Sequence, residues 1–143
     1  AEQADVIAGL VSAGIPVMAH IGLRPQTVHQ MGGYKVQRDQ AKLLSDAQAA
    51  QEAGAFAMVV ECVPADMAAE ITAAVSVPTI GIGAGAECDG QVLVLNDVLG
   101  LTCGYVPRFV KAYADLRSTI QGAVRQYCRE VADGQFPAAG QQF

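Results

Sequence analysis

Two side chains that can exchange protons stand at the ends of short apolar segments. Glu61 follows the apolar run Phe56–Val60, and His20 follows the run Val17–Ala19. A carboxylate and an imidazole are among the groups that most often act as general acid or base. If both runs are strands of one parallel sheet, both side chains lie at the strand ends where such sheets bind ligands. Glu61 therefore stands where a catalytic acid or base would be, and the shared edge favours a catalytic role for His20 as well.

Both residues also have a purely structural interpretation. A glutamate at a strand end can be solvated or can pair with an arginine, and a lone strand histidine is often a hydrogen-bonded core residue. The spacing of His20 and His29 matches no zinc signature, so it predicts no metal site. The shared edge predicted for Glu61 and His20 favours the catalytic interpretation over the structural one.

A glycine-rich turn is a second candidate site. Gly81, Gly83 and Ala86 fit the G-x-G-x-x-G/A dinucleotide fingerprint. That fingerprint requires a long helix directly after it to hold the pyrophosphate, whereas the next element here reads as a strand. The pattern therefore favours a tight turn where two backbones approach closely, with N–H groups that could line one wall of a pocket.

Two basic residues lie on the long connection, residues 21–37, that leaves the His20 strand. Arg24 and Lys35 can neutralise an anionic substrate, or both can be solvated. Connections longer than about 12–15 residues are usually active-site lids or disordered segments. Because this connection starts at the same strand end as His20, we expect a lid.

The composition limits the classes of protein to consider. The chain has 143 residues, of which 52% are hydrophobic and 16% charged, as in a globular protein. A net charge of −5 argues against nucleic acid or an anionic membrane as partner. No apolar run approaches the ~20 residues of a membrane span, and the first residues lack a signal-peptide pattern. The 4 cysteines form no C-x-x-C pair, which favours reduced thiols in a cytosolic protein.

Helices and strands must alternate to position these residues. Three times, a helix-like segment stops at a glycine or before a proline, and an apolar strand follows within a few residues. This alternation predicts βαβ units and a parallel sheet. The predicted strands are residues 17–20, 56–61, 79–83 and 91–95. The predicted helices are residues 4–13, 39–53 and 64–74, with an amphipathic C-terminal helix at about 109–133.

Four buried parallel strands cannot close a barrel by themselves, because a (β/α)₈ barrel needs about 250 residues. The chain is therefore either a small open α/β sheet or about half of a larger domain. Exposed apolar edges beside strands 17–20 and 91–95 would indicate a missing half, whereas polar, covered edges would indicate an independent module.

Several long strings in the sequence together resemble one enzyme family. They are AHIGLRPQTVHQMGGYKVQ, VVECVPADMA, VPTIGIGAGAECDGQVLVLNDVLGL and VRQYCREVADGQFP. From about Ile15 to Phe143, in unbroken order, the chain is similar to ketopantoate hydroxymethyltransferases (3-methyl-2-oxobutanoate hydroxymethyltransferases). The resemblance implies a (β/α)₈ TIM barrel of the phosphoenolpyruvate/pyruvate superfamily. Residues 1–143 would then be the C-terminal half of a single barrel domain, about its last four βα units.

The resemblance also implies an activity and its participants. The family transfers a hydroxymethyl group from 5,10-methylenetetrahydrofolate to 3-methyl-2-oxobutanoate, giving 2-dehydropantoate for pantothenate and coenzyme A synthesis. Mg²⁺-assisted enolate formation and a cytoplasmic homo-oligomer, typically a decamer, are implied as well. Glu61 matches the proton-accepting glutamate of the family's E-C-V-P motif. His20 matches the histidine of the H-(I/L)-G-L motif, which lines the substrate site.

The chain departs from the family pattern in two places. The family's metal-binding acidic residues and its substrate-binding serine and lysine lie in the first half of the barrel, so no position here matches them. We therefore expect no Mg²⁺ ligands in this chain and no activity without an N-terminal half. The family also has G-R-G and further residues after K-V-Q, whereas Gln37 runs directly into Arg38 here. We expect the joining residues to lie outside the printed sequence rather than the lid to be shortened.

Two alternatives to a transferase half stay open at this point. The chain could be a free-standing α/β module that binds or assembles and keeps only the scaffold of the barrel. It could also be another enolate-forming enzyme of the same superfamily, which fits the barrel but not the E-C-V-P and G-I-G-A-G strings together.

Overall fold

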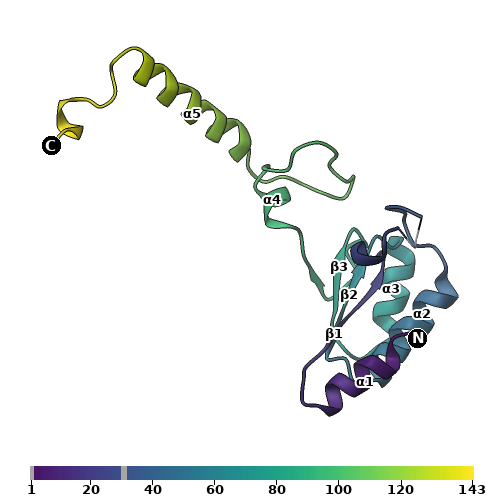
Figure 1. Ribbon diagram of the computed structural model, residues 1–143. Helices are drawn as coiled ribbons and strands as arrows, with labels where there is room; N and C mark the ends of the chain where they lie inside the picture. The colour runs from purple at the N-terminus through teal and green to yellow at the C-terminus, as the bar shows by residue number, and fades with distance from the viewer. Residues whose placement is uncertain (1, 30–31) are drawn as a thin grey trace. The chain divides into compact units, whose positions relative to one another are not determined.

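The computed structural model describes residues 2–29 and 32–143, and the chain divides into two compact units, shown in Figure 1. Unit 1 is Ala1–Val92 and unit 2 is Leu93–Phe143. In chain order, the elements of unit 1 are α1 (Ala4–Ser12), β1 (Met18–Gly22), η1 (Pro25–Thr27), α2 (Gln40–Glu52), β2 (Ala57–Glu61), α3 (Ala65–Ala74), β3 (Thr79–Ile82) and β4 (Gly90–Gln91). Those of unit 2 are α4 (Leu95–Val98), α5 (Leu116–Ala132) and η2 (Ala139–Gln141).

The strands of unit 1 form a 4-stranded parallel sheet in the order β1-β2-β3-β4. Gly22 of β1 pairs with Glu61 of β2, and Glu61 pairs with Ile82 of β3. The carboxyl ends of β1, β2 and β3 therefore lie level with one another. We call these three residues, with those that directly follow them, the rim. The predicted α/β fold with a parallel sheet is confirmed.

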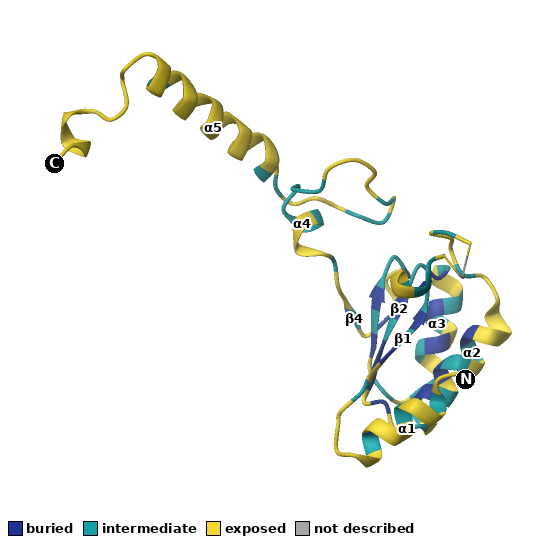
Figure 2. Cartoon of the chain, viewed as in Figure 1, coloured by how far each residue is buried: buried dark blue, intermediate teal, exposed yellow. Residues whose placement is uncertain are grey.

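One face of the sheet packs against helices and forms the core of unit 1. Side chains alternate between the two faces along each strand, and Figure 2 shows the buried residues where the strands meet α2 and α3. The cluster includes, from strands and then helices, Ala19, Ile21, Met58, Val60, Leu43, Ala47, Ala68 and Ile71. The apolar stripes of α2 and α3 thus cover this face of the predicted sheet.

The opposite face of the sheet is only half-buried. It presents His20 of β1, Val59 and Glu61 of β2, and Ile80 and Ile82 of β3. Parallel sheets are normally covered on both faces. In the described part of the chain, α2 and α3 cover only the other face, and Val59, Ile80 and Ile82 are half-buried on this one.

β1 is an edge strand of the described sheet, with a strand neighbour on one side only. A pocket of ≈ 240 Å³ lies beside it, lined by residues of β1, α1 and α2 and by the segment that follows β1. An apolar edge strand with an open groove next to it is the feature that the sequence analysis associates with a missing neighbour.

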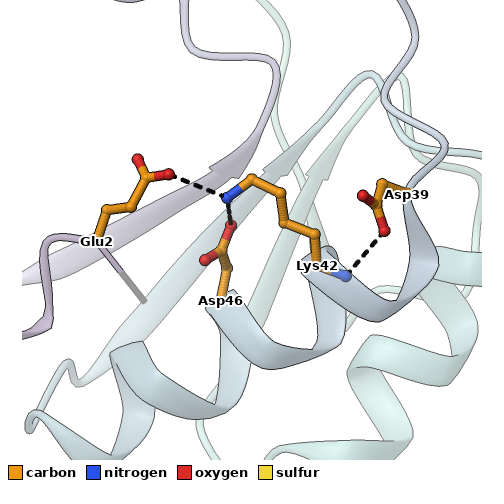
Figure 3. A network of polar contacts seen from close by, with 4 residues as sticks. All are labelled: Glu2, Asp39, Lys42 and Asp46. Atoms are coloured by element: carbon orange, nitrogen blue, oxygen red, sulfur yellow. Dashed lines mark hydrogen bonds and ion pairs between the residues drawn. The ribbon is translucent and has the colours of Figure 1, made fainter.

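A polar network ties the start of the chain to α2 beside this pocket. The Lys42 ammonium lies 3.2 Å from an Asp46 oxygen and 3.5 Å from a Glu2 oxygen (Figure 3). The Lys42 backbone N–H donates to Asp39, which caps the start of α2. The hydrogen bond with Asp46 raises the pKa of Lys42. Because Lys42 is half exposed, solvent screens these ion pairs, and they add little to stability.

The first six predicted elements lie within two residues of observed ones, whereas the strand predicted at 91–95 is wrong. β4 covers only Gly90–Gln91, and Leu95 already begins α4. The last ladder bond runs from the Val92 N–H to the Gly81 carbonyl, after which the chain enters unit 2. Val94 and Leu95 are exposed, so this apolar run has no sheet to bury it. A short apolar run does not by itself distinguish a strand from the start of a helix.

The C-terminal helix predicted at about 109–133 begins later than expected. α5 starts at Leu116, because the Asp115 side chain caps it by accepting from the Ser118 N–H. On either side of that cap, the Tyr113 N–H donates to the Val98 carbonyl and the Leu116 N–H to the Leu99 carbonyl. The backbone of the preceding segment is thus bonded to α4 and its end instead of continuing the helix. In the described part of the chain, no helix combines the length and the hydropathy needed to cross a bilayer.

Asp89 fixes the return of the chain from β3 to β4. Its carboxylate accepts hydrogen bonds from the N–H of fully buried Thr79, at 2.8 Å, and from the Thr79 hydroxyl, at 3.0 Å. These bonds stabilise the charged form and lower the pKa of Asp89 from its usual 3.8. The contact joins the start of β3 to the residue that precedes β4.

We expect the Asp89→Asn variant to be less stable than the parent chain at about pH 7 and equally stable at about pH 2. A carboxyl whose pKa is depressed by folding stabilises above its unfolded pKa, and this stabilisation is lost as the pH falls through the folded pKa. The measurement is the free energy of unfolding in denaturant at both pH values. Exposed Asp133→Asn is the matched control, and a pH-independent difference between Asp89→Asn and the parent would contradict the prediction.

Candidate active site

The two side chains predicted to share one edge of the sheet are in contact. His20 pairs with Val59 across β1 and β2, so Glu61, two residues further on, is its diagonal neighbour on the same face. His20 Nε2 lies 3.0 Å from Glu61 Oε2, and their side chains are 29% and 15% exposed. The structure thus brings the predicted acid–base pair together on the half-buried face, and their catalytic roles stay predictions.

The imidazole of His20 is oriented so that its contact with Glu61 is not an aligned hydrogen bond. Although Nε2 is at ion-pair distance from Glu61, it is buried and has no aligned hydrogen bond among the described residues. Alignment, and not distance alone, decides whether a hydrogen bond forms, so we treat the contact as electrostatic. A buried polar atom without a hydrogen bond is costly, so Nε2 is an unsatisfied polar atom beside Glu61.

The backbone of Glu61 is held from both sides. Its carbonyl accepts a hydrogen bond of 2.8 Å from the Leu23 N–H, just beyond β1. The next N–H, that of Cys62, donates to the Ile82 carbonyl of β3 at 3.0 Å. Glu61 thus lies in a strand bonded to both neighbours at its last residue, which limits the movement of the carboxylate.

Gly22 makes the close approach of β1 and β2 at the rim sterically allowed. Its φ is +84°, and a Cβ at this position would lie 2.2 Å from the Glu61 carbonyl oxygen and 2.8 Å from Val63 Cγ2. Only glycine fits there without a shift of the backbone. The sequence analysis did not single out Gly22, although this glycine lies within the H-(I/L)-G-L motif that begins at His20.

The other sequence candidates are not part of this contact. Arg24 is half-buried and lines the same pocket as His20 and Gly22, whereas His29 and Lys35 are exposed. The expected lid contains η1, and its later part is bonded to the rim, since the Gln37 N–H donates to the Cys62 carbonyl at 2.9 Å. Residues 30 and 31 of this loop lie outside the described residues.

The glycine-rich turn is a tight turn, as the sequence favours. Gly83 and Gly85 have φ values of +63° and +81°, and a Cβ at Gly85 would lie 2.5 Å from Ala65 Cβ at the start of α3. The segment leads into β4 and not into a helix, so it lacks the element that binds a pyrophosphate.

All cysteines are free thiols, and one of them lies at the rim. Burial, together with the negative charge of Glu61, raises the pKa of the Cys62 thiol. A thiol that stays protonated is a weak nucleophile. Among the described residues, no group of three or more His, Cys, Asp and Glu side chains is arranged to hold a metal ion.

Comparison with known proteins relates this site to one family. The sequence model of the family described as ketopantoate hydroxymethyltransferase matches residues 1–139. A 3-methyl-2-oxobutanoate hydroxymethyltransferase of Rhodopirellula baltica is 57% identical over 143 residues, which are 100% of this chain and 53% of the relative. Proteins of the same name from Carboxydothermus hydrogenoformans and Geobacter sulfurreducens are 57% and 56% identical, over 99% and 100% of this chain and 53% and 55% of their own lengths.

The chain thus spans about half the length of the curated relatives it matches. The match nevertheless extends over nearly all of its own residues, including both strands that carry the His20–Glu61 contact. The chain therefore belongs to the ketopantoate hydroxymethyltransferase family.

Proposed function

We propose that this chain is part of a 3-methyl-2-oxobutanoate hydroxymethyltransferase and supplies its proton acceptor, Glu61. The observation that most supports this is the 3.0 Å contact between Nε2 of His20, on β1, and Oε2 of Glu61, which ends the neighbouring parallel strand β2. Catalytic residues of α/β barrels lie at this end of the strands. The name shared by relatives that cover the whole chain supplies the reaction.

The proposed reaction begins with removal of a proton from C3 of 3-methyl-2-oxobutanoate. This proton is acidic because the adjacent keto group delocalises the negative charge of the enolate. Glu61 takes the proton, and His20, 3.0 Å from it, lines the substrate site in a supporting role. Hydrolysis of 5,10-methylenetetrahydrofolate breaks both of its N–CH₂ bonds, releases the one-carbon unit as formaldehyde and leaves tetrahydrofolate. C3 of the enolate adds to the formaldehyde carbon, and the alkoxide that forms takes up a proton to give 2-dehydropantoate.

The family resemblance implies a Mg²⁺ ion, which when bound would act as a Lewis acid in enolate formation. The described residues of this chain do not form a site for it, since they contain no suitable group of acidic, histidine or cysteine side chains. We propose that its ligands lie in a part of the enzyme outside this chain. The steps assigned here to Glu61 and His20 do not depend on the position of the ion.

We further propose that the sheet of unit 1 is part of a (β/α)₈ barrel. Two features support this: β1 has a strand neighbour on one side only in the described sheet, and Val59, Ile80 and Ile82 are half-buried on the face without helices. In a closed barrel this face would point inward, and β1 would pair with a strand from the other half. Glu61 and His20 would then face the barrel interior at its carboxyl end, where substrates bind.

The same proposal includes assembly into a cytoplasmic homo-oligomer, for which a decamer is the expected size. α5 supports an interface because most of its apolar stripe is exposed, although Tyr127 contacts the ring of Phe136 within unit 2. Four of its large apolar side chains are exposed, namely Ile120, Val124, Tyr127 and Val131. Such a stripe at helical spacing is normally buried against another element.

The test is a transferase assay on this chain with and without a co-expressed N-terminal half taken from the Rhodopirellula baltica relative. We expect formation of 2-dehydropantoate only when both halves are present. Formation of a stable complex without transferase activity would contradict the proposed function. Equal activity of the isolated chain would contradict the proposed division of the site between two halves.

A further inference from the structure

We propose that Cys62 is a positioning residue. Its left-handed backbone turns the chain directly after Glu61 and so holds the Glu61 carboxylate against His20. The effect of Cys62 on the contact between Glu61 and His20 is a matter of geometry alone. Its effect on catalysis rests on the proposed function.

The conformation of Cys62 is unusual for a residue with a side chain. Its φ is +51°, and it is the one residue other than glycine with a positive φ in the described ranges 2–29 and 32–143. A Cβ makes this region of φ/ψ space unfavourable. Residues held in such conformations persist where the surrounding contacts determine them, and they cluster at functional sites.

The contacts of Cys62 explain why the turn is retained. Its N–H donates to Ile82 of β3, so it still completes the ladder between β2 and β3. Its carbonyl accepts from the Gln37 N–H, which belongs to the loop between β1 and α2. The following residue, Val63, is buried in the core, and Pro64 caps the start of α3. An extended residue at position 62 would continue the strand and could not satisfy all of these neighbours.

The left-handed turn at Cys62 affects the position of the Glu61 carboxylate. Glu61 is the last residue of β2, and its carbonyl is fixed by Leu23 while the next N–H is fixed by Ile82. An extended residue at position 62 could not keep both the Ile82 and the Gln37 hydrogen bonds, and loss of the Ile82 bond would free the peptide plane that joins it to Glu61 to rotate. Because the Glu61 side chain leaves from the same residue, its oxygen would move away from His20 Nε2. A misplacement of about 1 Å at such a site can cost about 10²-fold in rate.

The thiol itself is not the functional part of Cys62. Burial and the charge of Glu61 raise its pKa, which keeps it protonated and weakly nucleophilic. The role therefore belongs to the backbone, and substitutions that accept a left-handed conformation should replace cysteine.

The experiment compares Cys62→Gly and Cys62→Asn, which accept a left-handed conformation, with Cys62→Val, whose branched Cβ opposes it. In the completed transferase, we expect Cys62→Val to lower kcat by about 10²-fold, with the KM for the keto acid nearly unchanged. Cys62→Gly and Cys62→Asn should keep kcat within a few-fold. Cys103→Val, at an exposed cysteine of unit 2, makes the same chemical change and should leave kcat unaltered.

A second readout needs no transferase activity. In this chain alone, the ¹⁵N resonance of His20 Nε2 should shift in Cys62→Val, and the Leu23 and Cys62 amides should lose protection from hydrogen exchange. Both should stay as in the parent for the glycine and asparagine variants. If Cys62→Val does not fold, Cys62→Ala gives a smaller change in the same direction.

The outcomes separate the two proposals. Parent-like kcat and resonances in Cys62→Val would overturn the positioning role, as would equal damage in all three variants, which would assign the role to the thiol. A shifted His20 resonance in Cys62→Val, together with a parent protein that has no transferase activity in any assembly, would support the positioning role and overturn the proposed function.

Discussion

Replacing Glu61 with glutamine should lower the kcat of the completed transferase by about 10²–10⁴-fold, the usual contribution of a positioned general base. Glutamine keeps the size and the position of the side chain but cannot take up the C3 proton. The KM for the keto acid should change much less, because the lost interaction belongs to the proton-transfer step. The measurements are steady-state kinetics and the rate at which the C3 proton of 3-methyl-2-oxobutanoate exchanges with deuterium in D₂O.

Glu87→Gln is the matched control for this experiment. Glu87 is exposed in the turn between β3 and β4 and is one of the glutamates that the structure places outside the site. The control makes the same change in net charge, so it separates the loss of a base from an effect of charge. If Glu61→Gln kept the kcat and the exchange rate of the control, another group would be the base and the proposed role of Glu61 would be wrong.

Replacing Gly22 with alanine should destabilise unit 1 by about 2–5 kcal/mol, from backbone strain together with overpacking. The added methyl would lie 2.2 Å from the Glu61 carbonyl oxygen, which is backbone and cannot move without disturbing β2. The φ of +84° is also unfavourable for alanine. Because the clash is with Glu61 itself, the remaining folded protein should also lose activity. The measurement is unfolding in denaturant followed by circular dichroism.

Gly9→Ala serves as the control for the glycine substitution. Gly9 lies inside α1, and a Cβ there would have no heavy atom within 4 Å. Alanine should therefore stabilise this helix by about 0.5–1 kcal/mol. If Gly22→Ala had the same free energy of unfolding as the parent, β1 and β2 could move apart at the rim without loss of stability. Their close approach at Gly22 would then not be needed for folding.

The order of elements and the type of sheet could be predicted because they depend on local patterns. Buried parallel strands read as continuous apolar runs, and glycine or proline marks the ends of the helices between them. The run at 91–95 shows the limit of this reasoning. Val94 and Leu95 have the composition of a buried strand, but the chain leaves the sheet after Val92 and they are exposed. Apolar composition predicts burial only where a partner surface exists.

The C-terminal helix begins later than its apolar pattern predicts, because hydrogen bonds to another segment replace those of the helix. Phe109 and Tyr113 continue the spacing of the apolar stripe, so periodicity extends the helix toward them. The Tyr113 N–H is bonded to the Val98 carbonyl, and Asp115 supplies the cap. The spacing of apolar residues along one segment cannot show whether its backbone N–H groups bond within a helix or to a distant segment.

The sequence by itself determined which residues of this protein can exchange protons, that Glu61 ends a strand, and that the strands are parallel. His20, which was expected to end its strand as well, lies in the middle of β1. Only the tertiary structure decided that their side chains meet at 3.0 Å, and that Gly22 and Cys62 must adopt left-handed conformations beside them. The physical reason is the range of the forces involved. Strand and helix patterns arise from neighbours along the chain, whereas the distance between two side chains depends on register, twist and hydrogen bonds between segments far apart in sequence.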